Sequence, residues 1–505
     1  MDRLSTLDAE FLHLEDDVAH MVIAGVCVFD DPPPTLDEFQ QLIESKLHQI
    51  PRYRQRIRAV PFELGRPVWV DDPHFRLSYH VRHSALPSPG NDAGLARLMG
   101  RLMSQPLDHG RPLWEATLVE GLAGNRWALI FKLHHCMVDG VAGVELLSVL
   151  LDIEPHTSVA VPEPWEPAPE PAGAALVLDA WGGLASDVFG WAQKLPGALV
   201  HPVGAVRGLA ATGEGLLRFV RNLSMTPRLS IEGPISPHRV WASSSVSLGD
   251  VRTIRSVFGG TINDVVLAAV SGGYRELLRT RGEDPDHAVV RSLVPVSMRT
   301  NEGAGDAANR VSALLLELPV HIADPVARLA AVHEAMIDLK GSHMAEAGEV
   351  VAAVGNLFPP MLIGAATRLA MLVEHRRAQR VINTVTTNVP GPQFPLYCLG
   401  REMIEYRPYV PISPGLRVGT AILSYNGHLF FGITGDYDTA TDVSVVADAT
   451  AATIHELRDR ALIPSSSTSR AKRTSKPTST SKPTTKPRSK PASKPKPSGS
   501  RHRDR

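Results

Sequence analysis

The spacing of apolar side chains changes abruptly between two neighbouring segments of the chain. This change constrains the fold more than any other feature of the sequence. Residues 125–135, NRWALIFKLHH, place the large apolar side chains Trp127, Leu129 and Phe131 on one face. This two-residue period predicts a β-strand. Residues 139–152, DGVAGVELLSVLLD, instead repeat apolar side chains at helical spacing. A strand that passes directly into a helix predicts a mixed α/β fold.

The same mixture of strands and helices is predicted in both halves of the chain. Further strands are predicted over residues 20–30, 289–299, 310–320 and 381–392. Helices are predicted over residues 35–50, 261–282 and 324–342, the second of them opened by Asn263 or Asp264. Residues 418–438 predict a hairpin, because Asn426-Gly427 supplies the turn that a two-residue loop prefers.

Composition divides the chain into four parts. Residues 155–173 are rich in Pro and Glu, which is typical of a linker. The apolar, Gly- and Ala-rich residues 174–225 predict helices that pack in a core, with an interfacial surface for lipid as the alternative. The predicted parts are an N-terminal half over 1–154, the linker and apolar helices over 155–240, a C-terminal half over 241–463 and a basic tail over 464–505.

The tail differs from the rest of the chain in charge. Residues 464–505 hold thirteen Lys and Arg against one acid, a balance of +12, whereas the preceding residues hold 39 bases and 52 acids, a balance of −13. Ser, Thr, Pro and Lys bury little apolar surface, so we expect the tail to be disordered. It is either a solvated appendage or a peripheral contact with an anionic membrane or lipid droplet. Nucleic acid is disfavoured, since no aromatic residues are interleaved for stacking.

The N-terminus and the cysteines predict an intracellular location. Residues 1–17 are acidic and lack the charged-then-apolar pattern of a secretory leader. No uncharged run reaches the roughly 18 apolar residues of a spanning helix. Cys27, Cys136 and Cys398 are odd in number and far apart, which argues against a disulfide framework. We therefore expect a cytoplasmic protein that is not secreted, has no transmembrane helix and is at most peripheral at the inner membrane face.

The motif HHCMVDG, residues 134–140, carries the clearest chemical signal. Neutral histidine is a suitable base for a hydroxyl near pH 7. Neighbouring strand residues point to opposite faces, so only one of His134 and His135 faces a given cleft. A carboxylate at Asp139 could fix the turn that follows. A hydrogen-bonded histidine pair at a strand end is the alternative, and a metal site is less favoured because no HExxH or Cys-rich companion exists.

Rival catalytic motifs are absent or poor. The chain has no GxSxG nucleophile elbow and no Walker loop. Residues 303–308, GAGDAA, resemble the glycine-rich motif of dinucleotide-binding folds. That motif must be followed by a helix, whereas a strand is predicted after these residues. Cys136 follows His135 directly, so in a strand their side chains would point to opposite faces. We therefore expect Cys136 to pack in the core rather than to take part in the chemistry.

Several other motifs accompany HHxxxDG. They are LSTLDAEFLHLE at 4–15, RPLWE at 111–115, INDVVLA at 262–268, VPVSMR at 294–299, ANRVS at 308–312 and TNVPGP at 387–392. In this order they resemble the bacterial wax ester synthase/acyl-CoA:diacylglycerol acyltransferase family, over the whole chain except the tail. HHxxxDG alone is shared more widely, by chloramphenicol acetyltransferase-like enzymes and condensation domains.

The resemblance implies a fold and an activity. The fold is the α/β, two-domain CoA-dependent acyltransferase (chloramphenicol acetyltransferase-like) fold, with a tunnel at the domain interface. The activity is O-acyl transfer from long-chain acyl-CoA to diacylglycerol, giving triacylglycerol, or to fatty alcohols, giving wax esters. No metal or organic cofactor is expected, because the thioester already activates the acyl group and acyl-CoA is a co-substrate.

The resemblance also implies roles for individual residues. His135 is the expected general base, which takes the proton of the acceptor hydroxyl. His134, Asp139 and Gly140 are expected to hold its loop in shape, Gly140 by permitting a tight turn. Asn263 is expected to polarise the thioester carbonyl or to order the site.

The remaining implied roles are structural or concern the substrate. Three residues are expected to line or shape the acyl tunnel: Pro112, Leu113 and Trp114. Asp139 needs a cationic partner, for which Arg54 or Arg56 is favoured over Arg299.

Two alternatives to this activity stay open. One is an acyltransferase of the same fold that acts on a polyketide- or carrier-type acceptor, although RPLWE, INDVVLA and TNVPGP together speak against it. The other is a catalytically weak protein that binds lipid or coats lipid droplets, against which the intact HHxxxDG argues.

Overall fold

The computed structural model describes residues 2–137, 147, 149–155, 159–182, 228–297, 311–341 and 382–463. The elements below all belong to one compact unit, Met1–Leu462. The predicted disordered tail, most of the predicted apolar helices and the predicted start of the helix after HHCMVDG lie outside the described residues.

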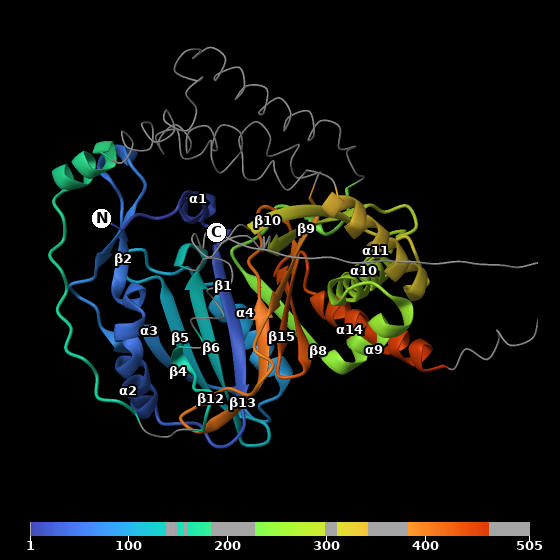
Figure 1. The fold of residues 1–505 in the computed structure, drawn as a ribbon, viewed down its shortest axis with the longest axis horizontal. Coiled ribbons are helices and arrows are strands. Elements are labelled where there is room, and N and C mark those ends of the chain that lie inside the picture. The colour runs from blue at the N-terminus through green and yellow to red at the C-terminus, as the bar shows by residue number, and fades with distance from the viewer. Residues whose placement is uncertain are drawn as a thin grey trace, which may run out of the picture. The chain divides into compact units, whose positions relative to one another are not determined.

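The first sheet has six strands in the order β12-β13-β1-β6-β5-β4 (Figure 1). Its strands are β1 Val22–Phe29, β4 Val81–Ala85, β5 Trp114–Leu122, β6 Arg126–His134, β12 Tyr397–Cys398 and β13 Arg401–Tyr409. The helices of this half are α1 Thr6–Leu14, α2 Leu36–Lys46, α3 Leu77–His80 and α4 Asp92–Met103. β1 and β6 confirm the strands predicted over 20–30 and 125–135, and α2 confirms the first predicted helix.

Strand β6 is buried on both faces. Its side chains point alternately to the two faces, so each of them packs in one of two cores. Trp127 and Leu129 pack in a core that includes Phe39 of α2. Ala128 and Ile130 pack in a second core that includes residues of α4. Even-numbered side chains of β6 therefore point toward α4, and the last of them ends the strand at position 134.

The second sheet also has six strands, in the order β10-β9-β11-β15-β16-β8. Its strands are β8 Arg239–Ser247, β9 Val290–Ser297, β10 Val311–Leu318, β11 Thr384–Pro390, β15 Val418–Tyr425 and β16 His428–Asp436. The helices of this half are α9 Leu248–Phe258, α10 Ile262–Thr280, α11 Pro325–Gly341 and α14 Val443–Leu462. The strands and helices predicted for this half are confirmed.

One turn and one helix start show how local sequence sets the ends of these elements. Asn426 and Gly427 have φ of 43° and 80°, so the predicted hairpin between β15 and β16 is confirmed with the positive φ values of a type I′ turn. The prediction that Asn263 or Asp264 opens α10 was wrong. Thr261 is the N-cap, and Asp264 at the third helical position completes a capping box with it.

Two strands of the second half of the sequence, β12 and β13, belong to the first sheet. β13 pairs antiparallel with β1, with Tyr406 opposite Cys27. The indole Nε1 of Trp241, on β8, donates to the carbonyl oxygen of Pro408, on β13, at 3.1 Å. The division of the chain near residue 240 therefore does not separate the two sheets, and the predicted domain boundaries stay a prediction.

The Pro-rich segment is extended and tied to the first half. The described residues 159–172 form no helix or strand. Glu170 accepts from Arg56 at 2.8 Å, and the Trp165 ring lies 4.6 Å from the guanidinium carbon of Arg54. A helix over 173–182 then packs on the ribbon of β2 Gln55–Arg58 and β3 Val68–Asp71.

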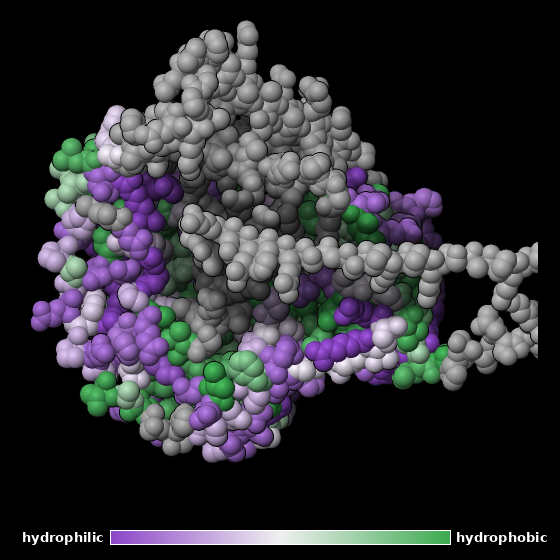
Figure 2. All heavy atoms as spheres, viewed as in Figure 1, coloured by the Kyte–Doolittle hydropathy of each residue, from purple (hydrophilic) through white to green (hydrophobic). Residues whose placement is uncertain are grey.

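The described surface carries no membrane-spanning element. Within the described ranges, no helix combines the length and hydropathy needed to cross a bilayer. On the face drawn in Figure 2, the surface around α2, α3 and β2 is mainly hydrophilic, with small separate hydrophobic areas.

Candidate active site

The two histidines of HHCMVDG lie where β6 ends. His134 is the last residue of the strand, and His135 begins the 3-10 turn η4 His135–Met137. The backbone N–H of His134 donates to Leu113 at 3.0 Å, and that of His135 donates to Met21 at 2.8 Å. The pair therefore stands at a strand end, as the change of period predicted. Asp139 and Gly140 lie outside the described residues.

His134 is fully buried and is held at both ring nitrogens. Its Nδ1 accepts a hydrogen bond from the backbone N–H of Cys136 at 3.1 Å. A neutral ring that accepts at Nδ1 carries its proton on Nε2. This Nε2 lies 3.2 Å from Oε2 of Glu15, a close electrostatic contact rather than a well-aligned hydrogen bond. His134 thus ties the turn that carries His135 to α1, whose C-terminus Glu15 follows.

His135 has the environment of a neutral base. Its ring stacks on Phe11 of α1, with ring centroids 3.8 Å apart and an interplanar angle of 25°. Its Nδ1 is buried and has no hydrogen-bond partner among the described residues. Burial lowers the pKa of His135 to about 4. The imidazole is therefore unprotonated at neutral pH, the state in which it can accept a proton.

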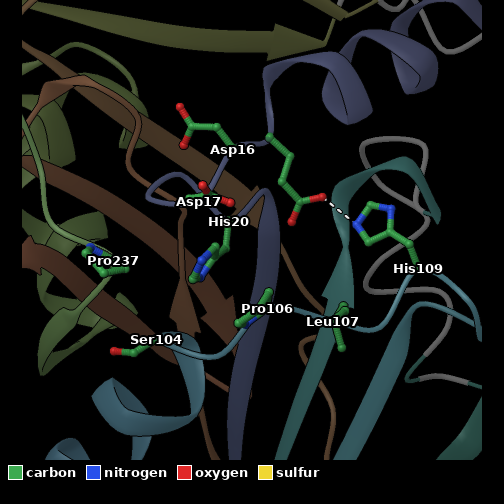
Figure 3. Close-up of a pocket in the computed structure, with 9 residues that line it drawn as sticks. Asp16, Asp17, His20, Ser104, Pro106, Leu107, His109 and Pro237 are labelled. Atoms are coloured by element: carbon green, nitrogen blue, oxygen red, sulfur yellow. Dashed lines mark ion pairs between the residues drawn. The ribbon is translucent and has the colours of Figure 1, made fainter.

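Glu15 joins His134 to a second histidine. Its Oε2 lies 2.6 Å from Nε2 of His109, a pair marked by the dashed line in Figure 3. Burial acts to raise the pKa of Glu15, but the contacts with His109 and His134 outweigh it and lower the pKa to about 2. The contact with Glu15 raises the pKa of His109. The 2.6 Å contact is therefore an ion pair beside His134 when His109 is protonated, the state that Glu15 favours.

A cavity of about 390 Å³ lies beside this ion pair (Figure 3). Carboxylates and histidines dominate its polar lining, which includes Asp16, Asp17 and His20. Ser104, Pro106, Leu107 and Pro237 complete the wall with Glu15 and His109.

The three groups Glu15, His109 and His134 are close enough together to suggest a metal site. Their ligand atoms all lie within 4.8 Å of one another. A metal on Nε2 of His134 would place the ring proton on Nδ1, and metal-binding histidines usually donate this second N–H to an acceptor. Here Nδ1 instead faces the N–H of Cys136, which is itself a donor. The group is therefore suited to sharing protons and charge rather than to binding a metal.

Glu15 and His109 were not predicted to belong to the site. Glu15 and Phe11 belong to the motif LSTLDAEFLHLE, and His109 lies two residues before RPLWE. Motif membership was the one available signal, since neither periodicity nor spacing along the chain brings positions 15, 109 and 134 together. Cys136 is buried, and its predicted packing role is confirmed.

The residues predicted to shape the acyl tunnel are core residues of β5 and the turn before it. Pro112, Leu113 and Trp114 are all buried. Trp114 donates from Nε1 to the carbonyl of Tyr53 at 2.9 Å and stacks on His80 at 4.7 Å. Leu113 accepts the N–H of His134, so this segment supports the histidine pair from the neighbouring strand. Contact with an acyl chain stays a prediction.

Asn263 pairs with a residue of another motif. It lies at the second position of α10, and its Oδ1 accepts from Nδ2 of Asn388 at 3.0 Å. Asn388 is the asparagine of TNVPGP, on β11. The fold thus brings together INDVVLA and TNVPGP, which are more than a hundred residues apart in the chain. A role of Asn263 toward the thioester stays a prediction.

The two predicted arginine partners of Asp139 both have other described contacts. Arg56 pairs with Glu170, and Arg54 donates to the carbonyl of Leu47 at 3.3 Å. Burial lowers the pKa of Arg54, which lies over Trp165. Pairing with Asp139 stays a prediction, because Asp139 and Arg299 are outside the described part of the chain.

Two family models match this chain and together cover most of it. The wax ester synthase/diacylglycerol acyltransferase catalytic domain matches residues 4–266. The C-terminal domain of the same enzymes matches residues 307–458.

Individual relatives agree with these matches. The probable diacylglycerol O-acyltransferase tgs1 of Mycobacterium tuberculosis is 38% identical over 450 residues, which are 88% of this chain and 94% of the relative. A putative diacylglycerol O-acyltransferase of Mycobacterium tuberculosis is 32% identical over 445 residues, 88% of each chain.

Solved structures show the same fold. The wax ester synthase/diacylglycerol acyltransferase from Marinobacter aquaeolei VT8 aligns with a TM-score of 0.65 at 25% identity, over 91% of this chain and 99% of that one. The first condensation domain of the CDA synthetase aligns with a TM-score of 0.55 at 16% identity, over 90% of this chain and 96% of that domain. The second likeness concerns the fold alone. The predicted two-domain acyltransferase fold is confirmed.

Proposed function

The chain belongs to the wax ester synthase/diacylglycerol acyltransferase family, and on this premise we propose that it transfers a long-chain acyl group from acyl-CoA to diacylglycerol. The product is triacylglycerol, and the reaction is a step of lipid biosynthesis. Fatty alcohols are a second acceptor class, since the matched family and the Marinobacter enzyme are also named for wax ester synthesis.

The observation that carries this proposal is the state of His135. It is a buried, neutral imidazole that stacks on an aromatic ring and stands at the end of a strand in the family's motif. In the proposed step it takes the proton of the acceptor hydroxyl while that oxygen attacks the thioester carbonyl. The tetrahedral intermediate then expels the CoA thiolate, which receives the proton back from His135. One ester bond forms, one thioester bond breaks, and no cofactor is needed.

A direct assay tests the proposal. The purified full-length protein is incubated with radiolabelled oleoyl-CoA and either diacylglycerol or hexadecanol, and the lipids are separated by chromatography. Labelled triacylglycerol is expected, and labelled wax ester would show the second acceptor class. Binding of lipid without either product would instead favour the lipid-binding alternative. Transfer to a carrier-bound acceptor alone would favour the other alternative.

The acidic side of the pH–rate profile should report the lowered pKa of His135. Because this pKa lies near 4, the imidazole stays neutral and active well below the ordinary histidine value. The acidic midpoint of kcat/KM is therefore expected near pH 4. Initial rates measured from pH 3 to pH 8 would test this, with circular dichroism at each pH to separate loss of the base from unfolding. A midpoint near 6.5 in a folded protein would contradict the assigned environment.

We also propose that the basic tail brings the enzyme to anionic membranes. The tail carries +12 and the rest of the chain −13, so the tail is the part that an anionic surface attracts. Each Lys or Arg near such a surface contributes about 1 kcal/mol, and the attraction falls off within a Debye length. Membrane or droplet contact would place the enzyme where its water-insoluble acceptor is found.

Truncation after Ile463 tests the tail. The shortened protein is expected to bind anionic liposomes more weakly than the full chain at low salt, because it lacks the basic residues. High ionic strength should remove the difference by screening. Turnover on detergent-dispersed substrate should be nearly unchanged, which serves as the folding control. Equal liposome binding by both proteins at low salt would leave the tail as a solvated appendage.

A further inference from the structure

The carboxylate of Glu15 is shared by two histidines with opposite exposure. His134 is fully buried, Glu15 has a side chain that is 10% exposed, and His109 has a side chain that is 48% exposed. Both imidazoles approach the same oxygen, Oε2. The other oxygen, Oε1, is buried and accepts no hydrogen bond from the described residues. The charge of Glu15 is therefore compensated through Oε2.

A proton added to His134 would disturb the turn that follows it. The imidazolium form carries N–H groups on both ring nitrogens. The new N–H on Nδ1 would face the backbone N–H of Cys136, which now donates to this atom at 3.1 Å. Two donors would then oppose each other next to His135. The turn is therefore compatible with neutral His134 and not with its cation.

We propose that His109 is a positioning residue, whose positive charge satisfies Glu15 and thereby keeps His134 in the neutral tautomer that holds the turn of His135. This inference rests on the proposed role of His135 as the base. An unpaired carboxylate within 3.2 Å of His134 would favour the protonated ring. His109 removes that tendency by carrying the proton itself, at the exposed end of the group.

Other nearby charges do not replace His109. Lys132, on β6, donates to the carbonyls of Leu102 and Gln105 at the end of α4. Arg239, on β8, donates to backbone carbonyls that include Val18. In the loop after Glu15, Asp16 accepts from the backbone N–H groups of Val18 and Ala19.

Among the described residues, further titratable groups near the pair are Asp17, His20 and Asp108. Asp17 and His20 line the cavity beside it, and the negative charge of Asp108 also favours the cationic form of His109. Burial and the charge of Arg239 lower the pKa of His20, which makes it a poor substitute for His109 as a cation. Among the described side chains, His109 is thus the cation placed to offset Glu15.

Two substitutions of His109 distinguish the effect of its positive charge from the effect of its side-chain shape. In His109→Gln the positive charge is lost, so Glu15 should draw a proton onto His134. The acidic midpoint of kcat/KM is then expected to rise by about 1–3 pH units, the range that an unpaired neighbouring charge produces. His109→Arg keeps a permanent cation and should retain the wild-type midpoint. Half-exposed His109 tolerates either change without a core defect.

The double variant Glu15→Gln/His109→Gln tests the cause. Without the carboxylate nothing draws a proton to His134, so the midpoint is expected to return toward the wild-type value. A role of His109 in packing alone would leave the double variant at least as impaired as His109→Gln. An unshifted midpoint in His109→Gln, or equal shifts in His109→Gln and His109→Arg, would overturn the proposal.

A measurement without turnover keeps this inference separate from the proposed reaction. In the full-length protein labelled with ¹⁵N-histidine, the ring nitrogen shifts of His134, assigned by a His134→Gln control, report its protonation state. At a pH between the two midpoints of kcat/KM we expect a neutral ring with its proton on Nε2 in the wild type and a doubly protonated ring in His109→Gln. If acyl transfer failed but this change appeared, only the proposed function would fall. The same ring state in both proteins would overturn the role of His109.

Discussion

Replacing His135 with alanine is expected to lower kcat/KM for acyl transfer by about 10²–10⁴-fold, the usual contribution of a general base. The imidazole lies at the end of β6 and its pKa is lowered to about 4, so at neutral pH it is the unprotonated group that the reaction needs. Alanine removes the base and leaves the strand unchanged. The test measures release of CoA and labelled neutral lipid together, with the thermal unfolding midpoint as the control for folding.

His134→Ala is the matched comparison for this variant. His134 is fully buried, accepts from the backbone of Cys136 and contacts Glu15, so its loss should lower the unfolding midpoint as well as turnover. His135→Ala should lower turnover with little change in the midpoint. A His135→Ala protein that kept more than about a tenth of wild-type turnover would show that another group is the base.

Trp114→Ala is expected to reduce the free energy of unfolding by about 3–5 kcal/mol, as for other fully buried large aromatic residues. The indole is fully buried, stacks on His80 and packs against Tyr53, to whose carbonyl it also donates. Alanine would leave a cavity in the core that includes Phe39 and Leu129, and an unsatisfied carbonyl on Tyr53. Chemical denaturation of wild type and variant measures the difference.

Trp114→Phe serves as the control that separates packing from substrate contact. Phenylalanine keeps most of the apolar volume and loses the hydrogen bond, so a smaller loss of stability is expected. If Trp114 instead lined the acyl tunnel, Trp114→Phe would change the preference among acyl-CoA chain lengths while the unfolding free energy stayed near that of wild type. That outcome would contradict the core role seen in β5.

Much of the fold could be predicted from local patterns. The side-chain alternation of β6 comes from neighbouring residues alone, and the turn between β15 and β16 requires residues that tolerate positive φ, which Asn426 and Gly427 do. The position of His134 and His135 at a strand end followed from the change of period. Local geometry sets each of these features, so a single sequence carries the information.

Sequence reasoning was least reliable where two distant segments meet. The start of α10 was a separate, local miss: it was misplaced because the capping box depends on which of several polar residues adopts the extended N-cap conformation. The pairing of β13 with β1 joins Tyr406 to the strand that carries Cys27, and no short-range pattern indicates this partner. Strand pairing across hundreds of residues is decided by which buried faces fit together.

The sequence by itself determined the family, the strand end at HHCMVDG and His135 as the expected base, because motifs and periodicities are local properties of the chain. Only the tertiary structure decided what surrounds that base. Packing of α1 against the end of β6 brings Phe11 onto His135 and Glu15 beside His134, and the turn before β5 adds His109. Burial and charge at such a site depend on groups that are neighbours in space and not in sequence, so the pKa of His135 could not be read from the residues around it.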